Sequence, residues 1–295
     1  MKVKQFAPVL GVSLAVAARP FIKWAGGKNQ LLTELLKHIP MPPQIGYGKG
    51  IGHYYEPFIG GGALYFRLRA LGFKGRATLG DSNERLVRTY MGVRNDVQAV
   101  IDGLKEHTYN KKEYLYERSR DVDSASWDDA DVAIWFIYLN RTGFNGLYRV
   151  NSKGQFNVPF GAYDNPLICD EANLRACSEA LRGTKLVMGD FIKTVKSAER
   201  GDLVYFDSPY APVNTTSNFT GYTLDGFTLE DQERLHDCAL SLKARGVHVI
   251  LSNADVPIVR KLYKGKEFTV RAVSARRAIN SKAASRGAVG EVIII

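Results

Sequence analysis

Short apolar runs alternate with helical patterns along most of the chain, and this alternation constrains the fold more than any other feature. Candidate strands end at Glu56, Gly80, Met188, Phe206 and Leu251, and two later ones lie near 268–273 and 291–295. Candidate helices cover 30–38, 62–71, 83–104, 229–243 and 257–262. Strands that are separated by helices usually pair in parallel, because each crossover helix returns the chain to the same edge. We therefore expect an α/β fold with a largely parallel sheet.

The alternation stops between Met91 and about Ile168. This stretch contains a helical piece at 130–140 and then a polar, aromatic and glycine-rich run that continues to Pro166. We interpret 91–168 as an inserted domain, 19–90 and 169–295 as the main domain, and 1–18 as an N-terminal extension. Within the extension, the apolar run 7–18 also resembles the core of a signal peptide. An extension is favoured, because the run leads directly into a motif at 21–28.

The charge balance favours a polyanionic partner. The chain has 40 Lys and Arg against 30 Asp and Glu, a formal net charge of +10. Nucleic acid is the foremost candidate, with a basic surface that has no specific partner as the alternative. Cys169, Cys177 and Cys238 have neither a pairing nor a metal-binding spacing, which indicates a reducing compartment and no metal. No run approaches the ~20 apolar residues of a membrane span. We expect a cytoplasmic, nucleoid-associated protein that is not secreted.

An apolar strand at 203–206 leads into Asp207, Ser208, Pro209 and Tyr210. This sequence places a carboxylate, main-chain carbonyl groups and an aromatic face at one point. Such a set can accept hydrogen bonds from an exocyclic amino group while the ring that bears it stacks on Tyr210. The tetrapeptide alone is weak evidence, since strand–turn sequences that contain proline are common.

A glycine-rich turn follows another candidate strand, at Glu56–Gly62. Gly60 and Gly62 allow close backbone approach to a ligand at the start of a helix, and Phe58 lies beside them. Asp81 follows the next strand and can accept hydrogen bonds from ribose hydroxyls, or alternatively cap the helix that begins near residue 83. The chain has no pyrophosphate-type glycine spacing and no Walker lysine loop. A nucleoside ligand without a diphosphate, such as S-adenosylmethionine, fits these features better.

Two further segments suit ligand and nucleic-acid contact. The run 21–28 contains Trp24 as a stacking face and Lys28 as a cation for a carboxylate. The run 139–149 has the Asn-Gly of a tight turn, and Phe144, Leu147, Tyr148 and Arg149 are expected to project from it. Such a loop could wedge into a duplex and read guanine, although a simply packed hairpin has the same pattern.

The basic stretch 273–286 precedes the last candidate strand. It contains Arg276 and Arg277 among small and polar residues. We expect phosphate contact there, and a solvated surface loop is the alternative.

Together these segments resemble the Dam-type DNA adenine-N6 methyltransferase family. The matching runs are KWAGGK at 23–28, EPFIGGG at 56–62, NRTGFNGLYRVN at 140–151, FNVPFG at 156–161, the tetrapeptide at 207–210 and SARRAINS at 274–281. They occur in the family's order across residues 20–295. The resemblance implies a Rossmann-like S-adenosylmethionine-dependent methyltransferase sheet with an inserted, mainly helical DNA-recognition domain that bears a hairpin loop. It also implies methylation of an adenine that is flipped out of duplex DNA, in GATC by the likeness of the hairpin.

The resemblance assigns roles to individual residues. The residues implied to bind S-adenosylmethionine are Trp24, Lys28, Phe58, Gly60, Gly62, Asp81, Phe191 and Asp207, and those implied to carry out methyl transfer are Asp207, Ser208, Pro209 and Tyr210. The residues implied to contact DNA are Lys23, Phe144, Asn145, Leu147, Arg149 and Pro159, with Arg276 and Arg277 at phosphates. No metal is implied, and we expect a monomer or a weak dimer.

Ser208 is the main departure from the family, which normally has Asp-Pro-Pro-Tyr. The position is expected to act through its main-chain carbonyl group, so serine can serve, with less restriction of the backbone. A catalytically weak or silent DNA-binding relative is therefore one alternative. A methyltransferase for another amino acceptor, such as cytosine N4 or an RNA adenine, is the other.

Overall fold

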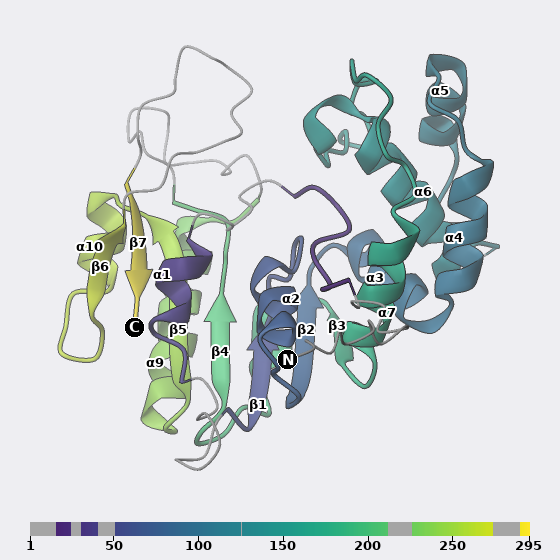
Figure 1. The fold of residues 1–295 in the computed structure, drawn as a ribbon. Helices are drawn as coiled ribbons and strands as arrows, with labels where there is room; N and C mark the ends of the chain where they lie inside the picture. Colours follow the sequence, from purple (N-terminus) through teal and green to yellow (C-terminus); the bar gives the residue numbers. More distant parts are fainter. Residues whose placement is uncertain (1–15, 25–30, 41–50, 125, 212–225, 274–289) are drawn as a thin grey trace, which may run out of the picture.

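A seven-stranded sheet forms the centre of the protein, in the order β3-β2-β1-β4-β5-β7-β6 (Figure 1). The computed structural model describes residues 16–24, 31–40, 51–124, 126–211, 226–273 and 290–295. Strands β1 to β5 pair in parallel, and β7 runs antiparallel between β5 and β6. The strands are β1 (His53–Glu56), β2 (Arg76–Asp81), β3 (Lys185–Met188), β4 (Leu203–Phe206), β5 (His248–Ala254), β6 (Val270–Val273) and β7 (Glu291–Ile294). The predicted α/β fold with a largely parallel sheet is confirmed.

Alternating side chains of the strands fill two separate cores, one on each face of the sheet. Leu203 and Tyr205 of β4 face one core, whereas Val204 and Phe206 face the other. The first core includes side chains from α1 (Leu32–Leu36), α2 (Ala63–Ala70), α3 (Glu84–Asn95), α4 (Val97–Glu106), α5 (Lys111–Ser119), α6 (Asp129–Thr142) and α7 (Glu171–Leu181). The second includes side chains from α8 (Phe191–Val195), α9 (Leu229–Ala244) and α10 (Pro257–Leu262).

The single helix predicted over 83–104 is wrong, because the chain forms two helices there. They meet at Asp96, whose φ of −142° leaves the helical region. The Asp96 side chain accepts a hydrogen bond from the amide of Ala99 (3.1 Å), which caps α4. Helices α5, α7 and α8 were not expected from the sequence. The predicted domain boundary at 90/91 lies inside α3.

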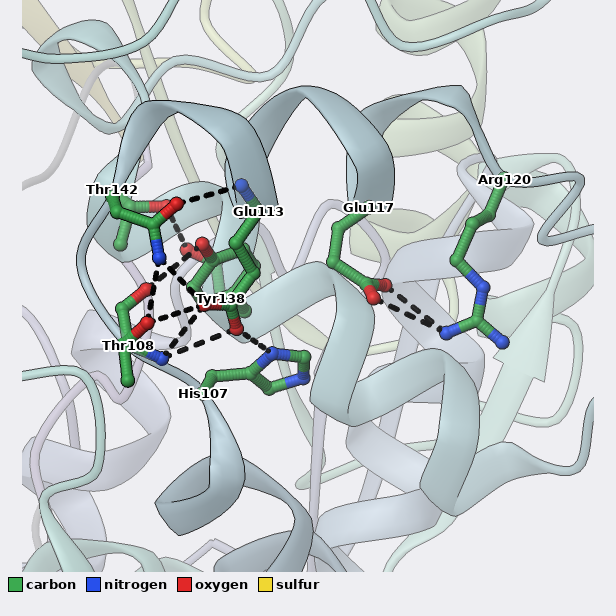
Figure 2. Close-up of polar contacts among 8 residues, drawn as sticks. His107, Thr108, Glu113, Glu117, Arg120, Tyr138 and Thr142 are labelled. Carbon is green, nitrogen blue, oxygen red and sulfur yellow. Dashed lines mark hydrogen bonds and ion pairs between the residues drawn. The ribbon is translucent and has the colours of Figure 1, made fainter.

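A cluster of polar side chains connects the first turn of α5 to α6 (Figure 2). The Glu113 carboxylate contacts Nδ1 of His107 (2.7 Å) and the amide of Thr108 (3.1 Å). The His107 ring stacks on Tyr138 of α6 with ring centroids 4.4 Å apart. Burial works to raise the pKa of Glu113, but the hydrogen bonds from Thr108 and His107 outweigh it and lower that pKa. The cluster stabilises the C-terminal part of α6, which leads into the predicted recognition loop.

Helices α3 and α6 pack closely and join the helical part of the chain to the sheet (Figure 1). Gly92 of α3 lies against the main-chain carbonyl group of Asp129, with no room for a Cβ atom. Gly103 of α4 also lacks room, but its neighbour is the terminal Cδ1 of Ile134, which can rotate away. The first contact is rigid and the second is adaptable.

This difference predicts unequal effects of two glycine-to-alanine changes. Gly92→Ala should lower the free energy of unfolding by about 1–3 kcal/mol, because the backbone of α6 must move. Gly103→Ala is the matched control and should be nearly neutral, since gained helix propensity of about 1 kcal/mol offsets the rotation of Ile134. Urea unfolding of both variants checks this, and equal losses would contradict it.

Candidate active site

The order of the strands reverses between β1 and β4, and open α/β sheets bind ligands at the carboxyl ends of strands beside such a reversal. The strands β2 and β3 lie on one side of β1, whereas β4 and then β5 lie on its other side. Three predicted features lie at these ends: the glycine turn that follows Glu56 of β1, Asp81 at the end of β2, and Asp207 after β4. The fold therefore brings together motifs that are far apart in the sequence.

The turn after β1 has the backbone geometry that requires glycine. Gly60 has φ of 46°, and Gly62 has φ of 68° at the N-terminus of α2. The Gly60 amide donates to Oδ2 of Asp81 (3.2 Å), and its carbonyl group accepts from the Tyr90 hydroxyl (3.0 Å). A Cβ atom on Gly60 would lie 2.6 Å from Cδ1 of Trp24, so the Trp24 ring rests directly on the turn.

Asp81 is held by backbone donors. Its Oδ1 accepts from the amide of Asn83 (3.0 Å), besides the bond from Gly60 to Oδ2. Burial raises the pKa of Asp81 to about 6, although the hydrogen bonds oppose this shift. The alternative role as a helix cap belongs instead to Asn83, whose side chain accepts from the amide of Leu86 (3.2 Å). Asp81 thus keeps acceptor capacity at the edge of the site.

Aromatic rings line the neighbouring part of the site. Phe58 stacks on Phe191 with centroids 5.5 Å apart and planes 29° apart, and Phe227 packs edge-on to Phe58 at 5.8 Å. The Arg234 guanidinium lies 5.3 Å from the Phe191 ring centroid. Phe58 and Phe191, predicted to line one pocket, are in contact.

The tetrapeptide 207–210 is anchored at its second half. The Pro209 carbonyl group accepts a hydrogen bond from Nε2 of Gln232 (2.9 Å), and the Tyr210 hydroxyl donates to Oε2 of Glu291 (3.3 Å). Ser208 is only 3% exposed, and within the described part of the chain its hydroxyl has no hydrogen-bond partner. Asp207 is half-buried beside it.

Glu56 is a second carboxyl group close to Asp207. It is buried, and the Tyr54 hydroxyl donates to its Oε2 (2.8 Å). Burial holds the pKa of Glu56 well above its usual range; the Tyr54 hydrogen bond opposes this, and the charge of Asp207 adds to it. Glu56 therefore keeps its proton to a higher pH than an exposed glutamate does.

The predicted Asn-Gly turn is present, but two side chains that were expected to project from the loop, Leu147 and Tyr148, pack against the core instead. Asn145 (φ 54°) and Gly146 (φ 63°) are both left-handed, and Phe144 is 41% exposed. Isolated antiparallel bridges between Gly143 and Phe160, and between 150 and 156, close the loop. The exposed side chains of this loop include Phe144, Asn145, Arg149 and Pro159, besides those of 150–155.

The prediction that Tyr148 projects from the loop is wrong. Its ring packs against both Phe136 and Trp24, at centroid distances of 5.1 and 5.9 Å, and those two rings also contact each other (6.2 Å). The Arg85 guanidinium of α3 also donates to its hydroxyl (3.3 Å). An apolar pocket between α6 and the Trp24 segment outcompetes solvent for this ring. Leu147 is likewise partly buried against the core.

The last turn of α6 holds the start of the 23–28 motif against the loop. Asn140, 2% exposed, accepts from the Lys23 amide (2.8 Å) and donates to the carbonyl groups of Lys23 (2.8 Å) and Gly146 (2.9 Å). The next residue, Arg141, donates to the Phe21 carbonyl group (2.7 Å). The Lys23 ammonium group lies 4.3 Å from the Tyr163 ring centroid. The last turn of α6 thus holds both the segment that leads to Trp24 and, at Gly146, the loop.

Arg149 is exposed but already oriented. Its Nε donates to Oδ1 of Asn157 (2.7 Å) and its terminal amino group to the Asn157 carbonyl group (3.1 Å). These bonds use one edge of the guanidinium, so the other edge can meet an acceptor pair.

Some predicted residues lie outside the described part of the chain, namely Lys28, Arg276 and Arg277. Among the described residues, no group of three or more histidine, cysteine or acidic side chains is arranged to hold a metal ion. None of the helices in the same part of the chain combines the length and apolar character of a membrane span.

The sequence did not single out several residues that position the site. They are Glu56, Tyr90, Asn140, Gln232, Asn253 and Glu291. Asn140 stands inside a recognised motif, and a polar residue in the apolar run of α6 was a usable signal. Gln232 and Tyr90 lie among ordinary helical residues and offered none.

Comparison with known proteins assigns this arrangement to a family. The family model described as D12 class N6 adenine-specific DNA methyltransferase matches residues 24–279. The chain is 42% identical over 282 residues to the type II methyltransferase M1.LlaDCHI of Lactococcus lactis subsp. cremoris, covering 94% of each chain. It is 40% identical to the type II methyltransferase M.MjaIII of Methanocaldococcus jannaschii, over 91% of this chain and 95% of the relative. It is 35% identical to the DNA adenine methylase of Vibrio cholerae, over 94% of this chain and 95% of the relative.

The Asn140 contacts predict a large effect of a nearly isosteric change. Asn140→Asp keeps the acceptor for the Lys23 amide but turns an oxygen toward two carbonyl groups. We expect the free energy of unfolding to fall by about 3 kcal/mol at neutral pH, because one oxygen of a buried carboxylate then faces two carbonyl oxygens. The control is Asn151→Asp at an exposed position, where the change should be far smaller. Chemical denaturation of the two variants measures this, and similar stabilities would refute the buried clamp.

Proposed function

The chain belongs to the D12 class of N6 adenine-specific DNA methyltransferases, and we propose that it methylates an adenine extruded from duplex DNA within GATC. Proteins of this family use S-adenosylmethionine as the methyl donor. The observation that carries the proposal is the convergence of Asp81, the glycine turn and the tetrapeptide 207–210 at adjacent strand ends. This convergence supports a nucleoside site beside an acceptor site for an amino group.

The residues at the strand ends fit S-adenosylmethionine. The stacked pair Phe58 and Phe191 offers an apolar wall for the adenine ring, and Asp81 offers carboxylate acceptors for the ribose hydroxyls. Gly60 and Gly62 let the backbone approach without a side chain in the way. Trp24 rests on this turn and would close the site over the donor. S-adenosylmethionine supplies the methyl group, and the protein supplies orientation.

The tetrapeptide would activate the target amine. Adenine N6 is a poor nucleophile, because its lone pair is delocalised into the ring. Asp207 and the Ser208 carbonyl group would accept its two hydrogens and favour a more nucleophilic geometry. The Pro209 carbonyl group already accepts from Gln232, which leaves the one of Ser208 for this role. The surplus proton leaves N6 after the methyl group has arrived, and no covalent enzyme intermediate is needed.

Base extrusion would use two aromatic residues. Tyr210 would stack on the extruded adenine and hold N6 in line with the methyl group, while its hydroxyl is held by Glu291. Phe144 and Asn145, both exposed in the loop, would enter the duplex beside the vacated position. A wedge of this kind repays part of the cost of unstacking.

Recognition would rest on the same loop. Arg149 would pair with O6 and N7 of a guanine through the guanidinium edge that Asn157 leaves open. Leu147 and Pro159 would touch bases, and Lys23 would lie over the first base of the site. Arg276 and Arg277 would contact phosphates. The target GATC rests on the likeness of the hairpin to loops that read it.

Sequencing of modified bases in DNA from a methylation-deficient host that expresses the chain tests the proposal. We expect N6-methyladenine confined to GATC, together with protection of plasmid DNA from a nuclease that GATC methylation blocks. Methylation at another motif would overturn the recognition sequence alone. A soluble protein that binds S-adenosylmethionine and leaves every adenine unmodified would favour a silent DNA-binding relative or another amino acceptor.

The raised pKa of Asp81 predicts pH-dependent cofactor binding. Ribose hydroxyls require the ionised carboxylate, so affinity for S-adenosylmethionine should be constant above about pH 6, the pKa of Asp81. Below it, the affinity should fall by up to about tenfold per pH unit as the group takes up a proton. Calorimetric titration between pH 5 and 8 would measure this (roughly the span of the ionisation). Asp81→Asn should bind more weakly at all pH values, with no such slope.

Arg149→Ala should relax recognition at one base. Loss of a paired guanidinium should remove about 1–3 kcal/mol of discrimination at a single position of the site. Competition assays with DNA that carries single-base changes measure it. Arg118→Ala, which removes a bond to the Val158 carbonyl group on the far side of the loop, is the control for general disturbance. Uniform weakening across all sequences would make Arg149 a phosphate contact instead.

A further inference from the structure

Two buried amide side chains connect α9 and β5 to the tetrapeptide. Gln232 is 4% exposed and Asn253 is 2% exposed. Nδ2 of Asn253 donates to Oε1 of Gln232 (3.1 Å), and Nε2 of Gln232 donates to the Pro209 carbonyl group (2.9 Å). On its other side, Oδ1 of Asn253 accepts from the amides of Ala211 (3.1 Å) and Ala254 (2.8 Å).

The direction of these hydrogen bonds is fixed by the backbone. The amides of Ala211 and Ala254 can only donate, so Asn253 must present its oxygen to them and its amino group to Gln232. Gln232 must then accept with its oxygen, which turns its own amino group to Pro209. The chain of donors has one consistent orientation and ends on a main-chain carbonyl group of the tetrapeptide.

The pair grips both sides of Tyr210. Gln232 holds the residue before it and Asn253 holds the amide of the residue after it, while Glu291 holds its hydroxyl. Glu291 lies opposite Ala254, the residue after Asn253, in the antiparallel pair of β5 and β7. Asn253 and Glu291 therefore hold Tyr210 from neighbouring positions in the sheet. The peptide groups on each side of the stacking residue therefore cannot rotate without breaking a buried hydrogen bond.

Ser208 gives these contacts particular weight in this chain. Proline fixes φ near −65°, whereas serine leaves this torsion free. The Ser208 hydroxyl makes no hydrogen bond within the described residues, so the side chain does not replace that restraint. Pro209 still fixes its own φ and restricts the backbone of Ser208, and the hydrogen bonds from outside the tetrapeptide add to these restraints.

We propose that Gln232 and Asn253 are positioning residues for methyl transfer, because they occupy the Pro209 carbonyl group and thereby direct the Ser208 carbonyl group to the target amine. The inference rests on the proposed adenine methylation. It adds that two residues with no contact to DNA or donor set the geometry in which the two N6 hydrogens are accepted.

Single-turnover methylation by Gln232→Leu tests this, with saturating DNA and S-adenosylmethionine. We expect the rate of methyl transfer to fall by about a hundredfold, as for displacement of a reacting group by about 1 Å. Dissociation constants for both substrates should stay within about threefold of those of the unmodified protein, since uniform binding is untouched. Gln98→Leu, on the exposed face of α4, is the control and should transfer at the normal rate.

Gln232→Glu supplies a readout that a merely structural role would not move. The protonated carboxyl group can donate to Pro209, and the carboxylate cannot. The rate of this variant relative to the unmodified protein should therefore rise as the pH falls. If Gln232→Leu does not fold, the pH dependence of the Gln232→Glu rate, relative to the unmodified protein, is by itself the test of the positioning role.

The outcomes separate the inference from its premise. If the unmodified protein methylates DNA and Gln232→Leu is equally fast, or the Gln232→Glu ratio is independent of pH, the positioning role is wrong while the proposed function stands. If the unmodified protein itself transfers no methyl group to adenine, the proposed function fails first.

Discussion

The parallel pairing of β1 with β4 is the constraint on which the site depends. Tyr54 and Tyr55 lie opposite Leu203 and Val204, so the two strands end at nearly the same level. The glycine turn of one and the tetrapeptide of the other consequently open at the same edge of the sheet. The strand order reverses at this pair, and in open α/β sheets such a reversal is where a ligand crevice forms. A shift in this register would separate the proposed donor site from the proposed amine site.

A second requirement is that the loop proposed to contact DNA keeps a fixed relation to that edge. Two kinds of contact provide it. Helix α3, which follows β2, packs on α6 so closely that Gly92 has no room for a side chain. Asn140 at the end of α6 then ties the Lys23 backbone to Gly146, and Tyr148 stacks on Trp24. The inserted helices thus reach the donor site through the 21–24 segment rather than through the sheet alone.

The period of the apolar residues was enough to place the strands, the parallel sheet and the strand ends that carry Asp81 and Asp207. The apolar pattern gave wrong predictions where contacts between distant parts of the chain determine the local structure. One polar residue, Asp96, splits a pattern that reads as one helix, because its side chain caps the second. Tyr148 belongs to a loop sequence that suits exposure, yet α6 offers it a ring to stack on. Gln232 acts only through partners from two other elements, and no local pattern encodes such partners.

The two carboxyl groups at the ends of β1 and β4 lie in different environments. In the proposed reaction, methyl transfer would place positive charge on N6, which a carboxylate at hydrogen-bond distance would stabilise more in the transition state than in the ground state. Asp207, half-buried just after β4, would have this role. Glu56 is buried, and burial together with the charge of Asp207 holds its pKa well above the usual range, while the hydrogen bond from Tyr54 opposes this shift. Burial and the neighbouring charge therefore both act against a second carboxylate beside Asp207.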